Sequence, residues 1–195
     1  MTLDHCSDVA AASWIAESAT PAMQLIAFGP AGYEAYVRVR FIRDPEVPGQ
    51  SEADVVVGHD HPSDLSQARR ALHDLARFTS TPEHCYFCLW EGYSDIPLPR
   101  EVRDGPLVTL PHRRYALLRG PLAAIDRWEH ELGAGQPIAP PAFVWPADRS
   151  WCLASDVDPH WAGIGGSRAA MDALLADPRL DAVVARPTEI QPEYG

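Results

Sequence analysis

Short strand-like runs alternate with single helical patterns along the whole chain, and this order limits the folds available to it. The clearest run spans residues 33–42. Its Val37, Val39 and Phe41 face one way and its arginines the other, so we expect a half-buried strand with a wetter arginine face. Runs of strands separated by single helices are typical of an α+β fold with a mixed or mainly antiparallel sheet. We predict that class, with about four helices.

The remaining elements follow from apolar spacing and from the Pro and Gly residues that end each pattern. We expect helices at 7–19, 64–78, 121–132 and 167–177. We expect strands at 23–29, 55–57, 84–92, 107–110, 114–119, 150–157 and 180–186, and a long polar loop at 92–105. Asp64 is expected to cap the second helix, with Gln67 reaching back in a capping box.

Composition narrows the class of protein. A chain of 195 residues is long enough to bury its own core, so we predict one domain over 1–195 with a short tail at 187–195. The formal net charge of -11 opposes binding to phosphate backbones, so nucleic acid is not an expected partner. No apolar run approaches the length of a membrane span, and the N-terminus lacks the pattern of a signal peptide. We therefore expect a cytoplasmic protein with reduced cysteines and no contact with a membrane.

Several stretches are similar to a family of uncharacterised actinobacterial proteins. They are residues 28–45, 81–93, 110–122, 143–158 and 165–178. The resemblance runs from about Phe28 to Arg186, and its most specific parts are the Trp-Pro-Ala-Asp-Arg block and the later Gly-Gly-Ser. It implies an intracellular protein of one domain. It implies no activity, cofactor or catalytic residue.

The first candidate ligand-binding group lies in the tryptophan-rich block. Asp148 and Arg149 stand between Trp145 and Trp151 in the sequence. A guanidinium that stacks on an indole and pairs with a carboxylate would make a rigid pocket wall, or a clamp that closes the loop onto the sheet. We favour the clamp, because structural ion pairs outnumber functional ones.

The second candidate group is the start of the last helix, Gly165-Gly166-Ser167-Arg168. A helix N-terminus presents free backbone N–H groups that can hold a phosphate or carboxylate, with Arg168 as a further donor. The same residues also make an ordinary capped helix start, in which the glycines allow the turn and Ser167 satisfies a donor. Both interpretations are open at this point.

A divalent cation is the cofactor that the sequence suggests, although no cofactor is the default. Asp156, Asp158 and His160 alternate, so on a continued strand they project from one face as oxygen and imidazole ligands. If the strand ends at Val157, the same residues begin a solvated loop. A metal site and a turn are therefore both consistent with the pattern.

Two further groups invite a metal interpretation. Cys85 and Cys88, with His84 before them, have zinc spacing, and His59 and His61 could complete the set. Residues three apart on a strand face opposite ways, however, so we expect buried thiols. His59 and His61 are expected to be solvated loop residues.

No catalytic set is evident, so we expect a binding or interaction protein whose aromatic, proline-flanked loops grip a partner. The alternative is a metal-dependent, hydrolase-like enzyme that acts on a small anionic substrate, with Asp156, Asp158 and His160 as ligands. A third hypothesis is an acidic surface that engages a basic protein such as a toxin or regulator. The oligomeric state is left open.

Overall fold

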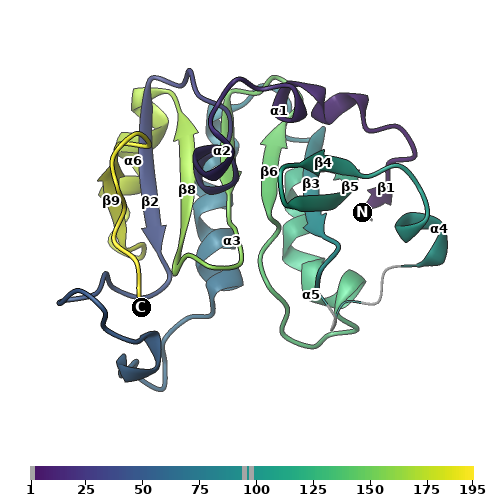
Figure 1. Cartoon of the computed structure of the whole chain (residues 1–195). Coiled ribbons are helices and arrows are strands. Elements are labelled where there is room, and N and C mark those ends of the chain that lie inside the picture. Colours follow the sequence, from purple (N-terminus) through teal and green to yellow (C-terminus); the bar gives the residue numbers. More distant parts are fainter. Residues whose placement is uncertain (1–2, 94–95, 97–98) are drawn as a thin grey trace.

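The computed structural model describes residues 3–93, 96 and 99–195, and a nine-stranded sheet forms its centre (Figure 1). Its strands are β1 (Asp4–His5), β2 (Ala35–Arg40), β3 (Cys85–Trp90), β4 (Val108–Leu110), β5 (Arg113–Gly120), β6 (Phe143–Pro146), β7 (Trp151–Ala154), β8 (Trp161–Gly166) and β9 (Ala182–Ala185). Their order is β1-β5-β3-β6-β7-β8-β2-β9, and β4 also pairs with β5. The pairs are antiparallel. The prediction of an α+β fold with a mainly antiparallel sheet is confirmed.

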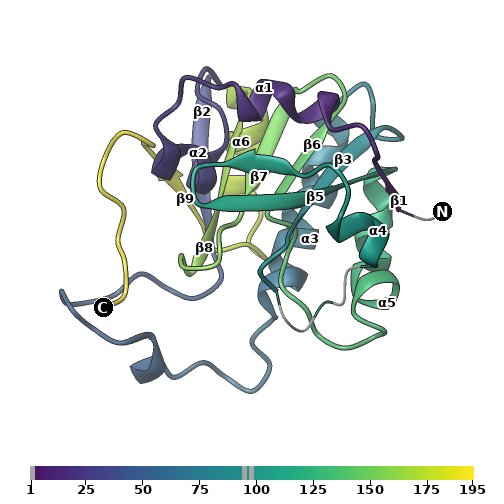
Figure 2. The same cartoon turned by 45° about the vertical axis from the view of Figure 1, so that its right-hand side comes forward.

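Helices cover both faces of this sheet. They are α1 (Ser13–Ala16), α2 (Ala22–Phe28), α3 (Asp64–Leu75), α4 (Arg100–Arg103), α5 (Trp128–Leu132) and α6 (Arg168–Ala176), with 3-10 turns η1 (Ala10–Ala12), η2 (Glu52–Asp54), η3 (Ala76–Phe78) and η4 (Leu122–Arg127). Helices α3, α5 and α6 pack on one face, and α1 and α2 pack on the other (Figures 1 and 2). None of the helices in the described ranges has the length and apolar character that crossing a membrane requires.

Strand alternation divides the core between these two layers. On β2, Val37 and Val39 are fully buried under α3 and α6, as their spacing predicts. The other face of β2 is drier than expected, because Arg38 is only 5% exposed. Its guanidinium lies 5.3 Å from the centroid of the Trp161 ring and pairs with Asp44. Aromatic and carboxylate partners thus compensate for the loss of water around this arginine.

The segment expected to be a strand at 23–29 is helix α2, and that expectation is wrong. Leu25, Ile26 and Phe28 are buried while Met23 is 69% exposed, which is helical rather than alternating burial. The helix ends at Gly29, whose φ of 77° lies in the left-handed region and whose N–H donates to Leu25 O.

Strand β8 is an element that the pattern missed, since three glycines in six residues weaken a strand on their own. Contact with neighbouring elements explains them. A Cβ on Gly163 would lie 2.2 Å from the carbonyl oxygen of Ala27, and one on Gly165 would lie 2.5 Å from Tyr33. Helix α2 and the chain after it can approach β8 closely only because these side chains are absent.

Other boundaries also differ from expectation. The strand expected at 150–157 is shorter, because β7 ends at Ala154, and the expected helix at 7–19 is only η1 and α1. Residues 55–57 form no strand and lie in the loop before α3. The predicted loop at 92–105 lies partly outside the described residues, and its described part contains α4.

The cap of α3 is Ser63 rather than Asp64, because the Ser63 hydroxyl accepts from the N–H of Ser66. Gln67 makes no capping box. Its side-chain amide donates to the carbonyl oxygen of Phe41 at 2.8 Å and to that of Pro62 at 3.2 Å. Gln67 therefore joins the start of α3 to the chain that leaves β2.

Candidate functional site

The two tryptophans of the β6–β7 hairpin lie on opposite faces of the sheet. Trp145 packs edge-on against Trp14 of α1, whereas Trp151 is buried on the face covered by α3 and α6. An arginine–indole stack does form, but with a tryptophan outside the block. The Arg149 guanidinium lies 5.1 Å from the centroid of the Trp14 ring.

Asp148 joins the same hairpin to the turn before β3. Its Oδ2 accepts hydrogen bonds from the Thr79 and Ser80 hydroxyls at 2.9 and 2.8 Å and from the Ser80 N–H at 2.7 Å. Its Oδ1 accepts from the Ser150 N–H at 3.1 Å. Desolvation opposes ionisation of this carboxyl, but the hydrogen bonds from Ser150 and Ser80 outweigh it and lower the pKa to about 2. These contacts are those of a structural clamp.

The residues expected to form a metal site belong to two separate groups. Asp156 receives a bidentate pair from Arg113 at 2.9 and 3.0 Å, and Asp158 contacts the same guanidinium at 3.2 Å. His160 instead donates from Nε2 to Asp44 Oδ1 at 3.1 Å. Across the described residues, no group of three or more His, Cys, Asp or Glu side chains is placed to hold a metal ion. The structure thus does not bring the expected ligand set together.

The start of α6 is occupied by the chain itself. Gly165 and Gly166 end β8, and the Ser167 hydroxyl caps the helix by accepting from the Ala170 N–H at 3.2 Å. The Arg168 N–H, one of the backbone groups that could have been free for an external anion, donates to Glu34 Oε2 at 2.9 Å. An internal carboxylate and the Ser167 hydroxyl therefore each accept one N–H group at this helix N-terminus.

The four cysteines are free, buried thiols, as expected. Cys85 and Cys88 fall in the cores on opposite faces of β3, so the zinc spacing brings no pair of sulfurs together. Burial raises the pKa of Cys85 to about 12. His61 contacts the Phe41 carbonyl oxygen at 2.5 Å rather than a thiol.

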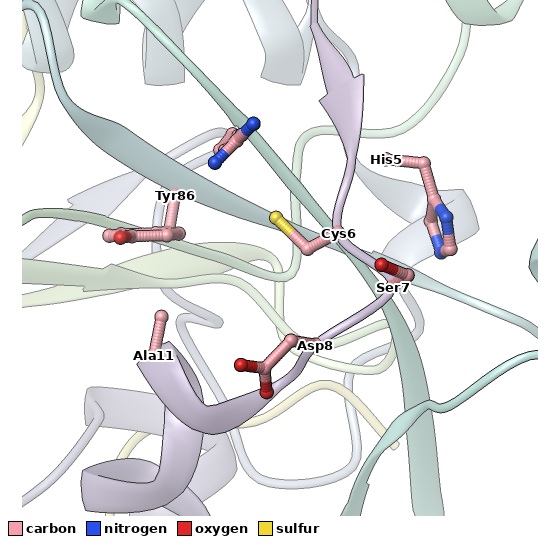
Figure 3. Close-up of a pocket in the computed structure, with 7 residues that line it drawn as sticks. His5, Cys6, Ser7, Asp8, Ala11 and Tyr86 are labelled. Atoms are coloured by element: carbon pink, nitrogen blue, oxygen red, sulfur yellow. The ribbon is translucent and has the colours of Figure 1, made fainter.

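A pocket that no sequence pattern indicated lies between β1, β3, β5 and the chain entering η1. Its volume is about 230 Å³, and it is lined by His5, Cys6, Ser7, Asp8, Ala11, Tyr86 and Arg119 (Figure 3). Figure 3 shows the Cys6 sulfur pointing toward the side where Tyr86 lies, with the Asp8 carboxylate below it and the His5 imidazole directed away. Polar groups of several kinds therefore surround one small hollow.

Strand register explains which side chains meet in this pocket. Tyr86 is paired directly with Arg119 across β3 and β5, and Asp4 is paired with Arg119 across β1 and β5. Directly paired residues of an antiparallel sheet project from the same face. Asp4, Cys6, Tyr86 and Arg119 therefore share the face covered by α1. No spacing within the sequence brings these residues together.

The pocket holds a thiol that is poorly suited to nucleophilic chemistry. Burial raises the pKa of Cys6 above its ordinary value, although the Arg119 charge acts in the opposite direction. The thiol is consequently protonated at neutral pH, and a protonated thiol is a weak nucleophile. These features favour binding over covalent catalysis.

A second pocket, of about 410 Å³, lies beside the β4–β5 hairpin and is lined by Trp90, Arg113, Arg114 and neighbouring residues. Its charged groups are already engaged. Arg113 pairs with Asp156 and lies 5.4 Å from the Trp90 ring centroid, and Arg114 pairs with Glu91. A ligand here would have to displace existing ion pairs.

The loop between β2 and α3 carries exposed apolar side chains and several acidic ones. Within residues 44–64 there are six acidic residues and no arginine. Val47, Val56 and Val57 are 59%, 91% and 46% exposed. Figures 1 and 2 both show this loop extending away from the sheet, with the C-terminus beside it. We call residues 44–64 the acidic loop.

Comparisons with protein-family models, with curated proteins and with solved structures find no match for this chain. No relative therefore supplies a ligand, reaction or partner. Among the described residues, the acidic loop offers exposed valines, and the pocket beside β1 offers the Arg119 and Asp8 side chains.

Proposed function

We propose that this protein is a non-enzymatic interaction protein that docks a basic protein partner through its acidic loop. The observation that carries the proposal is the exposure of Val56, which is 91% exposed within a run of three valines. Large apolar side chains that are grouped in water mark interaction surfaces. A loop of this length inside a folded chain is also uncommon unless it has a function.

The acidic loop is held in place at its base, which supports a prepared surface rather than a loose linker. The carbonyl oxygen of Phe41, just before the loop, accepts a hydrogen bond from the Gln67 side-chain amide and is also in hydrogen-bond contact with the His61 ring. At the first residue of the loop, Asp44 pairs with Arg38 at 2.7 Å and with Arg40 at 3.0 Å. The loop therefore leaves and re-enters the fold at fixed points, so less conformational entropy is lost when a partner binds.

The C-terminal segment extends the same surface. The Tyr194 hydroxyl donates to the Arg43 carbonyl oxygen at 2.6 Å, and the Gly195 N–H donates to the Gln50 carbonyl oxygen at 2.9 Å. The segment also carries Ile190, which is 99% exposed. The end of the C-terminal segment thus lies against the first part of the acidic loop.

The charge of this surface favours a basic partner. Glu46, Glu52, Asp54 and Asp60 lie in the acidic loop, and the whole chain has a formal net charge of -11. Complementary charge speeds the encounter of two proteins and excludes partners of like charge, while apolar side chains at the centre of the contact provide affinity. We further propose that this docking takes place in the cytoplasm, because four free thiols suit a reducing compartment.

The experiment is capture from a cell extract by the immobilised protein, followed by titration of the purified partner. Val56→Ser combined with Val57→Ser should weaken binding about tenfold or more, and higher salt should weaken it further. Met23→Ser is the matched control, since Met23 is 69% exposed on α2 and lies outside the loop. A partner whose affinity is insensitive to salt and to the valine substitutions would contradict the proposal.

No observation favours the alternative of a metal-dependent hydrolase. Asp156 and Asp158 are committed to Arg113, and His160 is committed to Asp44. Ion pairs within the fold therefore account for all three of these side chains. The interaction protein therefore stands as the single proposal for the chain.

A further inference from the structure

The pocket beside β1 contains opposite charges that do not neutralise one another. Arg119 and Asp8 both line it, yet they form no ion pair with each other. Proteins commonly pair neighbouring charges where geometry allows, as Arg113 and Asp156 do elsewhere in this chain. The pocket therefore offers one exposed cationic side chain and one exposed anionic side chain that are not paired with each other.

The guanidinium of Arg119 is available for a ligand. Within the described ranges it has no hydrogen-bond or ion-pair partner, although Asp4 is its direct neighbour across β1 and β5. The paired strands nevertheless fix its backbone, because β5 bonds to β1 on one side and to β3 on the other. The Arg119 side chain is exposed, and a planar guanidinium can receive a carboxylate through two parallel hydrogen bonds.

The carboxylate of Asp8 is oriented but only partly used. Its Oδ1 accepts the N–H of Ala10 at 2.8 Å, which sets the side chain at the start of η1. Its second oxygen is left to accept from a ligand. Figure 3 shows the Asp8 carboxylate directed away from the Ser7 hydroxyl, on the side where Ala11 lies.

Tyr86 and Cys6 give the pocket its less polar surfaces. The Tyr86 ring stacks on Trp145 with ring centroids 5.4 Å apart and an interplanar angle of 21°, so its position is fixed from behind. Cys6 is 9% exposed and carries no charge at neutral pH. These two groups can contact the carbon atoms of a ligand, while Arg119 and Asp8 contact its charged ends.

We propose that this pocket binds a small zwitterion of the α-amino acid type, with its carboxylate on Arg119 and its ammonium group on Asp8. A simple anion would leave Asp8 beside a like charge, and a simple cation would do the same with Arg119. The volume of about 230 Å³ lies below that of pockets for drug-sized molecules, which suits a ligand of this size. This binding goes beyond the proposed docking function and uses none of the residues of the acidic loop.

The experiment titrates the whole protein with each of the common amino acids and follows binding by calorimetry and by amide chemical shifts. The tightest ligand is then compared with its N-acetyl derivative, which keeps only the carboxylate, and with its amide, which keeps only the ammonium group. We expect both derivatives to bind at least about tenfold more weakly, because each lacks one charged contact. The shifted amides should include those of Cys6 and Asp8.

Variants test the same contacts from the side of the protein. Arg119→Gln and Asp8→Asn should each lower the affinity for the amino acid by about tenfold to a hundredfold. The Asp8→Asn variant keeps a side-chain oxygen that can accept from the Ala10 N–H. Arg114→Gln, on the same strand but paired with Glu91, should leave the affinity unchanged. The proposal is overturned if no amino acid binds, if the N-acetyl derivative binds equally well, or if Arg114→Gln has the same effect as Arg119→Gln. The comparison of ligands needs no variant, so it decides the matter even if a variant fails to fold.

Discussion

His160 donates from Nε2 to Asp44 Oδ1 at 3.1 Å, although 116 residues separate the two in the chain. The same carboxylate receives Arg38 and Arg40, and the Tyr194 ring lies edge-on to the imidazole with centroids 4.7 Å apart. The Asp44 carboxylate thus joins β2 and the acidic loop to the residue before β8, and the His160 ring connects these to the C-terminal segment. The surface proposed for docking depends on this junction.

Replacing Asp44 with Asn should destabilise the protein by about 2 kcal/mol, because the Arg38 side chain is only 6% exposed and would lose its counter-charge. The free energy of unfolding in urea measures this change. Asp158→Asn is the control, since Asp158 is 80% exposed and its ion pair with Arg113 contributes little to the free energy of unfolding. Equal losses in the two variants would contradict the role of Asp44 as a junction.

Stability should fall as the pH drops from about 4 to about 2. The pKa values of Asp44 and Asp148 are both lowered from 3.8 to about 2, because their hydrogen bonds outweigh the desolvation that opposes ionisation. A lowered pKa in the folded state means that the stabilisation is complete above the unfolded value and is lost as the pH falls through the folded value. Thermal unfolding midpoints from pH 7 to pH 2 measure this loss. In the double variant Asp44→Asn, Asp148→Asn, the unfolding midpoint should depend less on pH. If the pH dependence were unchanged, other carboxyl groups would be responsible for the loss of stability.

Gly163→Ala should destabilise the protein by about 3 kcal/mol, because the new Cβ would lie 2.2 Å from the backbone oxygen of Ala27 and would force α2 away from β8. Gly58→Ala is the matched control, since nothing lies within 4 Å of a Cβ at that loop position. Urea unfolding of both variants measures the difference. If Gly163→Ala were as stable as the wild type, α2 would not be packed on β8 as closely as described.

The elements that were predicted correctly have a pattern within their own residues. The alternation in β2 places Val37 and Val39 in the core, and the dense apolar run of β3 is buried on both faces. Ser167 caps α6 as expected, because a cap needs only the hydroxyl and the N–H groups of the next turn. Local chemistry is sufficient for these features.

The elements that were missed depend on contacts between distant segments. Residues 161–166 carry three glycines, and only the approach of α2 shows why a strand there requires them. Residues 23–29 have apolar side chains that suit either a strand or a helix, and burial against β7 and β8 selects the helix.

The sequence by itself determined the α+β class, the main strands, the capped last helix and the acidic net charge, because each depends on residue type and short-range spacing. Only the tertiary structure decided which polar groups meet. It placed Asp156 on Arg113, His160 on Asp44, and Tyr86 beside Arg119. The physical reason is that antiparallel register and sheet order bring together residues far apart in the chain, and no local pattern records that pairing.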